Sequence, residues 1–412
     1  MMTREENELM CRVAPGTPMG QMLREYWAPA LRSQALEADG APVRVRMLGE
    51  NYIAFRASDG RVGFFDEGCP HRCTSLALAR NEDNALTCIF HGWKIDVSGK
   101  VVEVPSEPPE RRAEFATKVR VRHYPVREAG DTIWVYLGQR ETPPKFYNFE
   151  FNLLPSNQLD VYRAVMHCNW VQGLEAVLDS AHIGLMHRSW LRNFNRGNET
   201  MANNSPIFEV VAKPYGFCEG ALRDLWDGTS YARIREVVMP YYSFIPTDPG
   251  DPNFMICAIP IDDEWTAQWY YFYDLKQPLK GDCLVGHSGD KNNFCSSMGS
   301  IDNMWKQDRK AMKEGHWTGI TSILQFEDFV AEESMGAIVD RSREYLGSSD
   351  SIIIRARRML LQAVREYQRS GIPPFGLLDE VDYTKVRALG IRFKNDISWK
   401  QIDTLNPPTW VE

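Results

Sequence analysis

Four side chains that bind transition metals lie in two short groups between residues 69 and 91. The first group is Cys69-x-His71 and the second is Cys88-x-x-His91, with sixteen residues between them. Two thiolates and two imidazoles can hold one zinc ion, or a [2Fe–2S] cluster with the cysteines on one iron and the histidines on the other. Zinc fingers usually place the cysteines in one group and the histidines in the other. Each group here supplies one of each, which favours the cluster.

This spacing, with the Gly92-Trp93 pair that follows it, resembles the Rieske motif. The resemblance implies a [2Fe–2S] cluster held by Cys69, His71, Cys88 and His91. Respiratory Rieske proteins carry a further cysteine beside each group, joined as a disulfide. Cys73 would be the first of these, but the segment CIFHGW contains no partner for it. We therefore expect Cys73 to be a small buried residue, and the cluster to be the low-potential type that feeds an oxygenase.

A second set of candidate ligands lies in the segment NWVQGLEAVLDSAHIGLMH. Glu175, Asp179 and His182 fall at i, i+4 and i+7, so a continuous helix would carry them as one stripe. Burying such a stripe is unfavourable unless it serves a metal or a polar network. His187 follows His182 by five residues, about 140° further round an ideal helix. Both rings can reach one ion only if the helix ends or bulges between them, which Gly184 permits.

Two histidines and one carboxylate, with open positions left, form the facial triad of mononuclear non-haem Fe(II) oxygenases. The spacing Asp179-x-x-His182-x-x-x-x-His187 matches the iron motif of Rieske oxygenases. The alternative, two ordinary buried histidines, is disfavoured by the cluster motif in the same chain. The carboxylate ligand is expected in ILQFEDFVAEESMG, where spacing alone does not choose among Glu327, Asp328, Glu332 and Glu333.

The sequence as a whole resembles the phthalate dioxygenase-like group of ring-hydroxylating oxygenases. The similarity covers VAPGTPMGQMLREYW, the loop CPHR, the segment QGLEAVLDSAH and the late segment ESMGAIVDRSREYLGSSD. It implies that Asp328 is the third iron ligand, with Glu327 as its rival, whereas Glu332 and Glu333 are charges on a helix face. It also implies that Asp179 bridges a cluster histidine of one subunit to an iron histidine of its neighbour.

The same resemblance implies the partners. The oxygenase component is expected to be a homotrimer or a stacked hexamer. Its electrons are expected from a separate NADH-dependent reductase that carries a flavin and a [2Fe–2S] cluster. The chain has no dinucleotide-binding fingerprint of its own, which agrees with this requirement.

The function implied is that of a terminal oxygenase that uses O2 to dihydroxylate an aromatic carboxylic acid, either phthalate- or benzoate-like or a diaryl acid. The same metals would also serve a monooxygenase that removes a methyl group from oxygen or nitrogen of a methoxylated aromatic. A third hypothesis is a Rieske electron carrier with an appended binding domain, which predicts no mononuclear iron. An aromatic acid suggests a cation in the pocket, and the candidates are Arg223, Arg233 and Arg235.

The helices and strands expected to position these residues indicate an α+β protein. Residues 1–41 are expected to form a helical lead-in on the catalytic domain, with a short helix in 18–31 that is ended by proline. Alternating residues over 42–140 predict a small all-β domain, the Rieske domain of the resemblance. Residues 141–412 are expected to form the catalytic domain, for which the resemblance implies a helix-grip-like antiparallel sheet with helices. Its clearest helix is IIIRARRMLLQAVREYQ, with an N-cap at Ser349 or Asp350 and its end at Gly371.

Composition agrees with this organisation. A chain of 412 residues is long enough for two domains, and its net charge of -8 argues against a nucleic-acid-binding protein. No apolar run approaches the ~20 residues that cross a bilayer, and the N-terminus MMTREENELMCRV lacks the apolar region of a secretory signal. The nine cysteines are scattered rather than spaced as a disulfide framework. We expect a cytoplasmic enzyme with no membrane partner.

Overall fold

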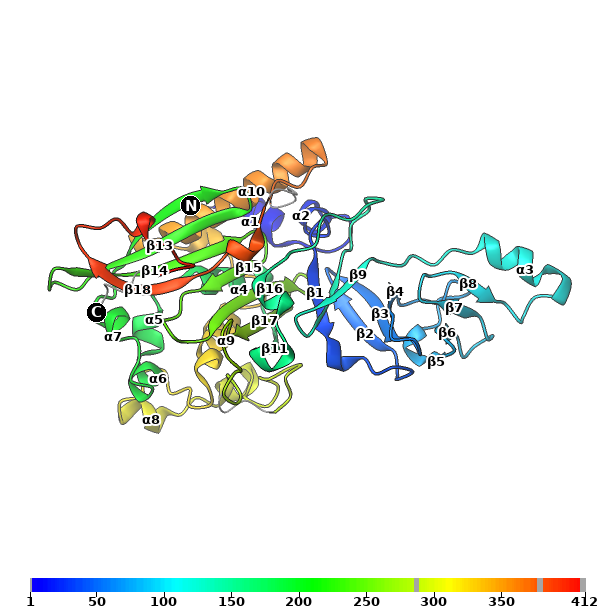
Figure 1. Cartoon of the computed structure of the whole chain (residues 1–412), viewed down its shortest axis with the longest axis horizontal. Helices are drawn as coiled ribbons and strands as arrows, with labels where there is room; N and C mark the ends of the chain where they lie inside the picture. Colours follow the sequence, from blue (N-terminus) through cyan, green and yellow to red (C-terminus); the bar gives the residue numbers. More distant parts are fainter. Residues whose placement is uncertain (1, 285–288, 376–380, 408–412) are drawn as a thin grey trace.

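The computed structural model describes residues 2–284, 289–375 and 381–407. It consists of a small all-β part and a larger part built on one sheet with helices (Figure 1). This arrangement confirms the predicted α+β class. Within the described ranges, no helix is long and apolar enough to cross a membrane.

The small part contains three antiparallel sheets, with strand orders β1-β10-β9, β2-β3-β4 and β5-β6-β7-β8. A helix that the sequence pattern did not indicate, α3 (Pro109–Lys118), follows β8. The strands are β1 (Ala28–Arg32), β2 (Val43–Met47), β3 (Glu50–Arg56), β4 (Val62–Asp66), β5 (Arg80–Glu82), β6 (Ala85–Thr87), β7 (Lys94–Asp96), β8 (Val101–Glu103), β9 (Val126–Ala129) and β10 (Thr132–Val135).

Strand β1 begins within residues 18–31, for which a short helix ended by proline was expected. Helix α2 (Pro18–Leu23) ends earlier, and β1 pairs with β10, Ala28 opposite Val135. All five residues of β1 are buried. Since Pro29 would interrupt a helix, the segment instead buries its apolar side chains in the sheet. The sheets of the small part therefore begin near residue 28, before the predicted boundary at residue 42.

The larger part is built on an eight-stranded antiparallel sheet with the order β11-β17-β16-β15-β14-β13-β12, in which β18 also pairs with β14. The strands are β11 (Leu159–Met166), β12 (Ile207–Lys213), β13 (Gly216–Asp224), β14 (Thr229–Val238), β15 (Tyr242–Ile245), β16 (Asn253–Pro260), β17 (Thr266–Tyr273) and β18 (Leu389–Lys394).

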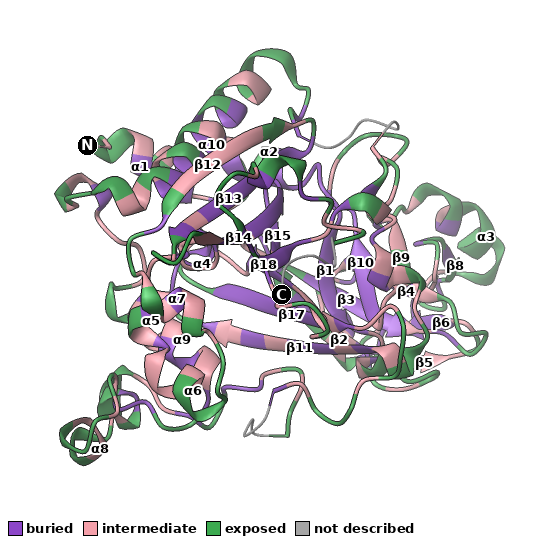
Figure 2. Ribbon diagram, turned by 60° about the vertical axis from the view of Figure 1, so that its left-hand side comes forward, coloured by how far each residue is buried: buried purple, intermediate pink, exposed green. Residues whose placement is uncertain are grey.

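Helices pack against this sheet and against each other. Helix α4 (Trp170–Leu178) contacts β16 and β17, and α9 (Leu324–Ser334) contacts α4. Helix α10 (Ser351–Ser370) begins after Asp350 and ends at Gly371, whose φ is +67°, as predicted. The other described α-helices are α1 (Arg4–Cys11), α5 (Ile183–Met186), α6 (Arg188–Asn193), α7 (Asn198–Ala202) and α8 (Arg309–Lys313). Figure 2 shows buried residues concentrated in the strands and exposed ones on the outer helices.

One hydrophobic core continues from the small part into the large sheet. The ring of Trp134 in β10 lies 6.1 Å from that of Tyr242 in β15 and 6.0 Å from that of Tyr271 in β17. Strands β5 to β8, whose loops carry the second cysteine-histidine group, lie at the end of the molecule far from α5 and α9 (Figure 1). The two candidate metal groups of one chain therefore lie on opposite sides of it.

Candidate metal centres and substrate cavity

The two cysteine-histidine groups lie on two tight loops with the same backbone pattern. In the loop after β4, the amide of Cys73 donates to the carbonyl of Cys69 at 2.8 Å, and in the loop between β6 and β7 the amide of Gly92 donates to that of Cys88 at 3.0 Å. The closing residue of each loop has positive φ, +57° at Cys73 and +72° at Gly92. Cys73 is exposed, so the expectation that it is buried was wrong. It is the left-handed turn residue of its loop.

The side chains of these two loops approach each other in like pairs, thiol with thiol and imidazole with imidazole. Cys69 and Cys88 are both buried, and burial, with the neighbouring Cys88 thiol, raises the pKa of the Cys69 thiol to about 11. The rings of His71 and His91 are 4.6 Å apart, and His71 also stacks on Trp93 at 4.6 Å.

The donor set fits a [2Fe–2S] cluster, with thiols on the inner side and imidazoles on the outer side. In the described part of the chain, Nδ1 of His91 is buried without a hydrogen-bond partner. A buried nitrogen of this kind is explained by a ligand that the nitrogen would bind.

The second set of candidate ligands is positioned by breaks in the helices rather than by one continuous helix. Helix α4 ends at Leu178, and Asp179 is its extended C-cap. His182 precedes α5, and His187 lies between α5 and α6. The predicted stripe was therefore wrong beyond Glu175, because the chain leaves the helix before Asp179. Gly184 lies within α5 and forms no bulge.

Gly184 has a different role from the one predicted. A Cβ atom at this position would lie 2.6 Å from the carbonyl oxygen of Thr200 in α7 and 2.5 Å from Oδ1 of Asn204. Its missing side chain thus permits the close approach of α7 to α5.

His182, His187 and Asp328 come together, each with one ligand atom within 4.8 Å of the others. Oδ1 of Asp328, on α9, lies 3.5 Å from Nε2 of His182 and 3.2 Å from Nε2 of His187. The opposite ring nitrogens face carboxylates: Nδ1 of His182 lies 3.3 Å from Asp179, and Nδ1 of His187 lies 2.8 Å from Glu327. Carboxylates at Nδ1 fix the rings and leave both Nε2 atoms to a metal.

This group fits a divalent metal. Oδ1 of Asp328 is buried and has no hydrogen-bond partner among the described residues. Burial acts to lower the pKa of His187, but Asp328 and Glu327 raise it to about 9. The site therefore favours a positive charge, which a bound metal would supply in place of a proton.

Sequence analysis did not predict the contact of Glu327 with His187. Glu327 lies in the first turn of α9 and also accepts a hydrogen bond from the hydroxyl of Thr318. The signal available in the sequence was its position next to Asp328, since neighbouring helical residues point about 100° apart and can approach one site from two sides.

The other acidic residues of this region are not among the three converging ligands, although Glu332 also lines the cavity beside them. Glu175 is held by two arginines, 3.0 Å from Arg341 and 2.6 Å from Arg357. Glu332 is buried, which raises the pKa of its carboxyl group well above the usual value. Glu333 accepts hydrogen bonds from the His167 amide and the Trp305 indole. The expectation of charges on a helix face therefore fails for Glu332, which is buried, whereas Glu333 is half-buried.

A cavity of about 200 Å³ lies beside these candidate ligands. It is lined by His182, His187 and Asp328, by the apolar or aromatic side chains of Ile183, Leu191, Ile256 and Tyr270, and by Arg233 and Arg235. Arg223 does not line it. Its side chain donates to the carbonyls of Ser180, at 2.6 Å, and Asn203, at 2.9 Å.

Arg233 and Arg235 share one face of β14 but differ in their partners. Arg235 lies opposite Glu219 of β13 and pairs with it at 3.1 Å, whereas Arg233 lies opposite Ala221. Nε of Arg233 is buried and has no hydrogen-bond partner in the described ranges. Arg235 also lines the cavity, and its Nε is likewise buried without a hydrogen-bond partner. Its Nη1, however, is paired with Glu219, so of the two predicted arginines that line the cavity, Arg233 is the one with no ion pair to the described residues, as an anionic ligand requires.

Two family descriptions match this chain. The Rieske [2Fe-2S] domain matches residues 26–125, and "LigXa C-terminal domain like" matches residues 135–409. The second match alone covers more than half of the chain.

Related proteins cover almost the whole chain. The chain is 35% identical to the 3-chlorobenzoate-3,4-dioxygenase oxygenase subunit of Comamonas testosteroni, over 93% of each. It is 35% identical to the phthalate 4,5-dioxygenase oxygenase subunit of Pseudomonas putida, over 97% of this chain and 94% of that one. It is 30% identical to the 5,5'-dehydrodivanillate O-demethylase oxygenase subunit of Sphingobium sp. (strain NBRC 103272 / SYK-6), over 90% and 83%.

A solved structure shows the same fold. The terminal oxygenase of carbazole 1,9a-dioxygenase from Nocardioides aromaticivorans IC177 superposes with a TM-score of 0.59 at 20% identity, over 87% of this chain and 97% of that one. With the family matches and the relatives, this leads to one conclusion. The chain belongs to the Rieske non-haem iron oxygenases, as an oxygenase subunit with a Rieske [2Fe-2S] domain and a LigXa-like C-terminal domain.

Proposed function

We propose that this oxygenase subunit dihydroxylates an aromatic carboxylic acid. The observation that carries the proposal is Arg233, whose free donor lines a mainly apolar cavity beside the three candidate metal ligands. The names of two relatives, which refer to 3-chlorobenzoate and phthalate, agree with an aromatic acid.

The two metal sites have different roles in the proposed reaction. Cys69, His71, Cys88 and His91 hold the cluster, and His182, His187 and Asp328 hold the iron. When bound, the iron supplies O2 binding and activation, with electrons that the cluster provides. Asp179 and Glu327 keep the two imidazoles in the orientation that presents Nε2 to the metal.

The cavity residues bind and orient the substrate. The guanidinium of Arg233 pairs with the substrate carboxylate, because planar N–H donors match carboxylate geometry. The apolar side chains of Ile183 and Ile256 exclude water around the ring. Arg235 is already engaged by Glu219 and by the carbonyl of Leu178, so it holds β14 against the end of α4.

Electron delivery requires other protein molecules. The cluster loops and the iron group lie on opposite sides of one chain (Figure 1), so we place the electron donor to this iron in a neighbouring copy, in a homotrimer or a stacked hexamer. The side chain of Asp179 remains 29% exposed, which leaves an edge that can meet a cluster histidine of that neighbour. A separate NADH-dependent flavin/[2Fe–2S] reductase supplies the electrons, and its need for NADH places the system in the cytoplasm.

A single turnover with labelled oxygen tests the function. The anaerobic, chemically reduced protein is mixed with phthalate, 3-chlorobenzoate, a diaryl acid or a methoxybenzoate, and 18O2 is admitted. We expect a ring diol carrying two heavy oxygen atoms.

One heavy oxygen with release of formaldehyde would contradict the proposal and establish the second candidate, an O-demethylase, which the 30% identical O-demethylase subunit favours. Unchanged acids with an iron-loaded protein would exclude both reactions on these compounds.

A further inference from the structure

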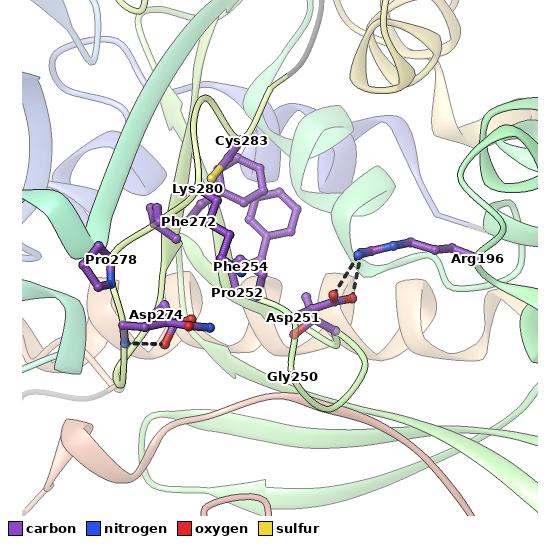
Figure 3. A pocket seen from close by; sticks show the side chains of 13 residues that line it. Arg196, Gly250, Asp251, Pro252, Phe254, Phe272, Asp274, Pro278, Lys280 and Cys283 are labelled. Carbon is purple, nitrogen blue, oxygen red and sulfur yellow. Dashed lines mark hydrogen bonds and ion pairs between the residues drawn. The ribbon is translucent and has the colours of Figure 1, made fainter.

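A second cavity lies next to the metal cavity and has more than twice its volume. This outer cavity measures about 480 Å³, against about 200 Å³ for the cavity beside the candidate metal ligands. Its walls come from the loop between β15 and β16, from the loop after β17 and from Arg196 after α6 (Figure 3).

Phe254 separates the two cavities. Among the described residues it is the one that lines both. It lies opposite Phe272 in the ladder between β16 and β17, and the two rings stack at 4.2 Å with 7° between their planes. Phe272 lines the outer cavity but not the metal cavity. Both rings border the outer cavity (Figure 3), and Phe254 also borders the metal cavity, so the stacked pair forms a partition whose inner face is Phe254.

The volumes indicate what the partition does. Pockets for drug-sized ligands have volumes of about 300–1,000 Å³. The metal cavity is smaller than this range, so with Phe254 in place it has room for a single substituted ring. Joined to the outer cavity, it would fall within the range for a ligand of two rings.

The outer cavity has charged lining residues, among them Lys280 and Asp274, but also an apolar wall that suits an uncharged ring. Pro252, Phe272 and Leu279 provide apolar contacts. The guanidinium of Arg196 is already paired with both carboxylate oxygens of Asp251, at 2.7 and 2.8 Å. A second carboxylate group would thus gain no free partner from Arg196, whereas an aryl group would pack on Phe272.

We infer that Phe254 is a specificity-determining residue that limits the substrate to one ring, and that the outer cavity receives a second aryl ring when the side chain of Phe254 is removed. This inference rests on the proposed function, since it assumes an aromatic acid anchored at Arg233.

Phe254→Ala opens the partition, and Phe254→Leu opens it in part. The matched control is Phe272→Leu, which alters the outer cavity on the same ladder but leaves Phe254 in place. Each protein is compared with benzoate and with 4-phenylbenzoate, by calorimetric binding without O2 and by kcat/KM in the reconstituted system. Thermal unfolding shows whether each variant folds.

We expect Phe254→Ala to prefer the two-ring acid at least tenfold more than the wild type does. The Kd for 4-phenylbenzoate should fall relative to that for benzoate, and its kcat/KM should rise relative to that for benzoate. Both changes should be smaller in Phe254→Leu. In Phe272→Leu the ratio between the two acids should stay within threefold of the wild-type ratio. A folded Phe254→Ala protein with an unchanged ratio, or a wild-type protein that already prefers the two-ring acid, would overturn the inference. If the wild-type protein binds neither acid, the proposed function fails before the partition is tested.

Discussion

Replacing Glu327 distinguishes the roles of the two neighbouring carboxylates of α9. Asp328 is expected to bind the iron, and Glu327 is expected to support a ligand histidine. Oε2 of Glu327 lies 2.8 Å from Nδ1 of His187, and Oδ1 of Asp328 lies 3.2 Å from Nε2 of the same ring. Glu327→Gln keeps the size of the side chain and removes its charge. It should leave the iron site intact but weaken it.

The size of the effect follows from the support that Glu327 gives. Loss of a carboxylate that holds a ligand histidine typically weakens metal binding 10–100-fold, which is about 1.4–2.8 kcal/mol. Asp328→Asn removes a charged ligand itself and should abolish iron retention on purification. Glu332→Gln is the matched control, because Glu332 is a buried carboxylate one turn further along α9 and contacts Cys168 rather than a histidine.

The assay is iron affinity by competition with a calibrated chelator, with the cluster absorbance as an internal reference for intact protein. We expect the affinity to fall in the order Glu332→Gln, Glu327→Gln, Asp328→Asn. If Glu327→Gln loses its iron completely while Asp328→Asn retains it, the assignment of Asp328 as the ligand is refuted and Glu327 takes its place.

Three further predictions follow from single contacts. Arg233→Leu should raise the KM for an aromatic acid by about 10–150-fold, because the substrate loses one charged hydrogen-bonding partner worth about 1.5–3 kcal/mol. The KM for the corresponding neutral methyl ester should change little. An equal effect on both compounds would contradict an ion pair. Glu175→Ala leaves Arg341 and Arg357 buried together, and we expect denaturant unfolding to show a loss of about 3–5 kcal/mol in the free energy of unfolding, with iron and cluster content retained in the folded protein. Burial raises the pKa of Glu236 to about 7, near Lys213 and with hydrogen bonds from Tyr215 and Cys218. Because the folded-state pKa is the higher one, protonated Glu236 stabilises the fold at low pH and this contribution is lost as the pH rises from about 4.5 through 7. Glu236→Gln should therefore be more stable than the wild type at pH 8 but not at pH 4.5, as measured by urea unfolding.

The metal-binding groups could be predicted because most of their residues are close in sequence. Two loops supply the cluster motif, and one segment supplies His182 and His187, so spacing alone carries the signal. Asp328 comes from a helix more than 140 residues later, and the resemblance rather than the spacing selected it. The role of Glu327 depends on which ring nitrogen it faces, and only the packing of α9 against the segment around His187 determines that.

The errors arose where tertiary packing decides local structure. Residues 28–32 follow a helical pattern and contain Pro29, yet they pair with a strand about 100 residues away. The stripe that begins at Glu175 is helical in its spacing, but α4 ends at Leu178, and the extended Asp179 directs the chain back toward α9. Cys73 was assigned to the interior by its residue type, although its backbone φ of +57° places it on the outside of a turn.

The distribution of charge on the sheet is a further reason to prefer an anionic substrate. Residues two apart on a strand share a face, so Glu219, Ala221 and Arg223 of β13 lie on one face with their partners Arg235, Arg233 and Tyr231 of β14. Three guanidinium groups thus share a face with one carboxylate. Burial lowers the pKa of Arg223 to about 10, which still leaves it charged at neutral pH.

This excess positive charge is unfavourable in a partly buried site unless an anion balances it. Asp179 interacts with Arg235 and also holds His182. Glu219 interacts with Arg233 but is paired with Arg235, so no carboxylate of the described residues is hydrogen-bonded to the Nε of Arg233. A substrate carboxylate beside Arg233 would supply the missing negative charge next to the iron ligands. A neutral methoxyarene would leave this charge unbalanced, so the electrostatics of the cavity favour the acid even though the metal ligands serve both reactions equally.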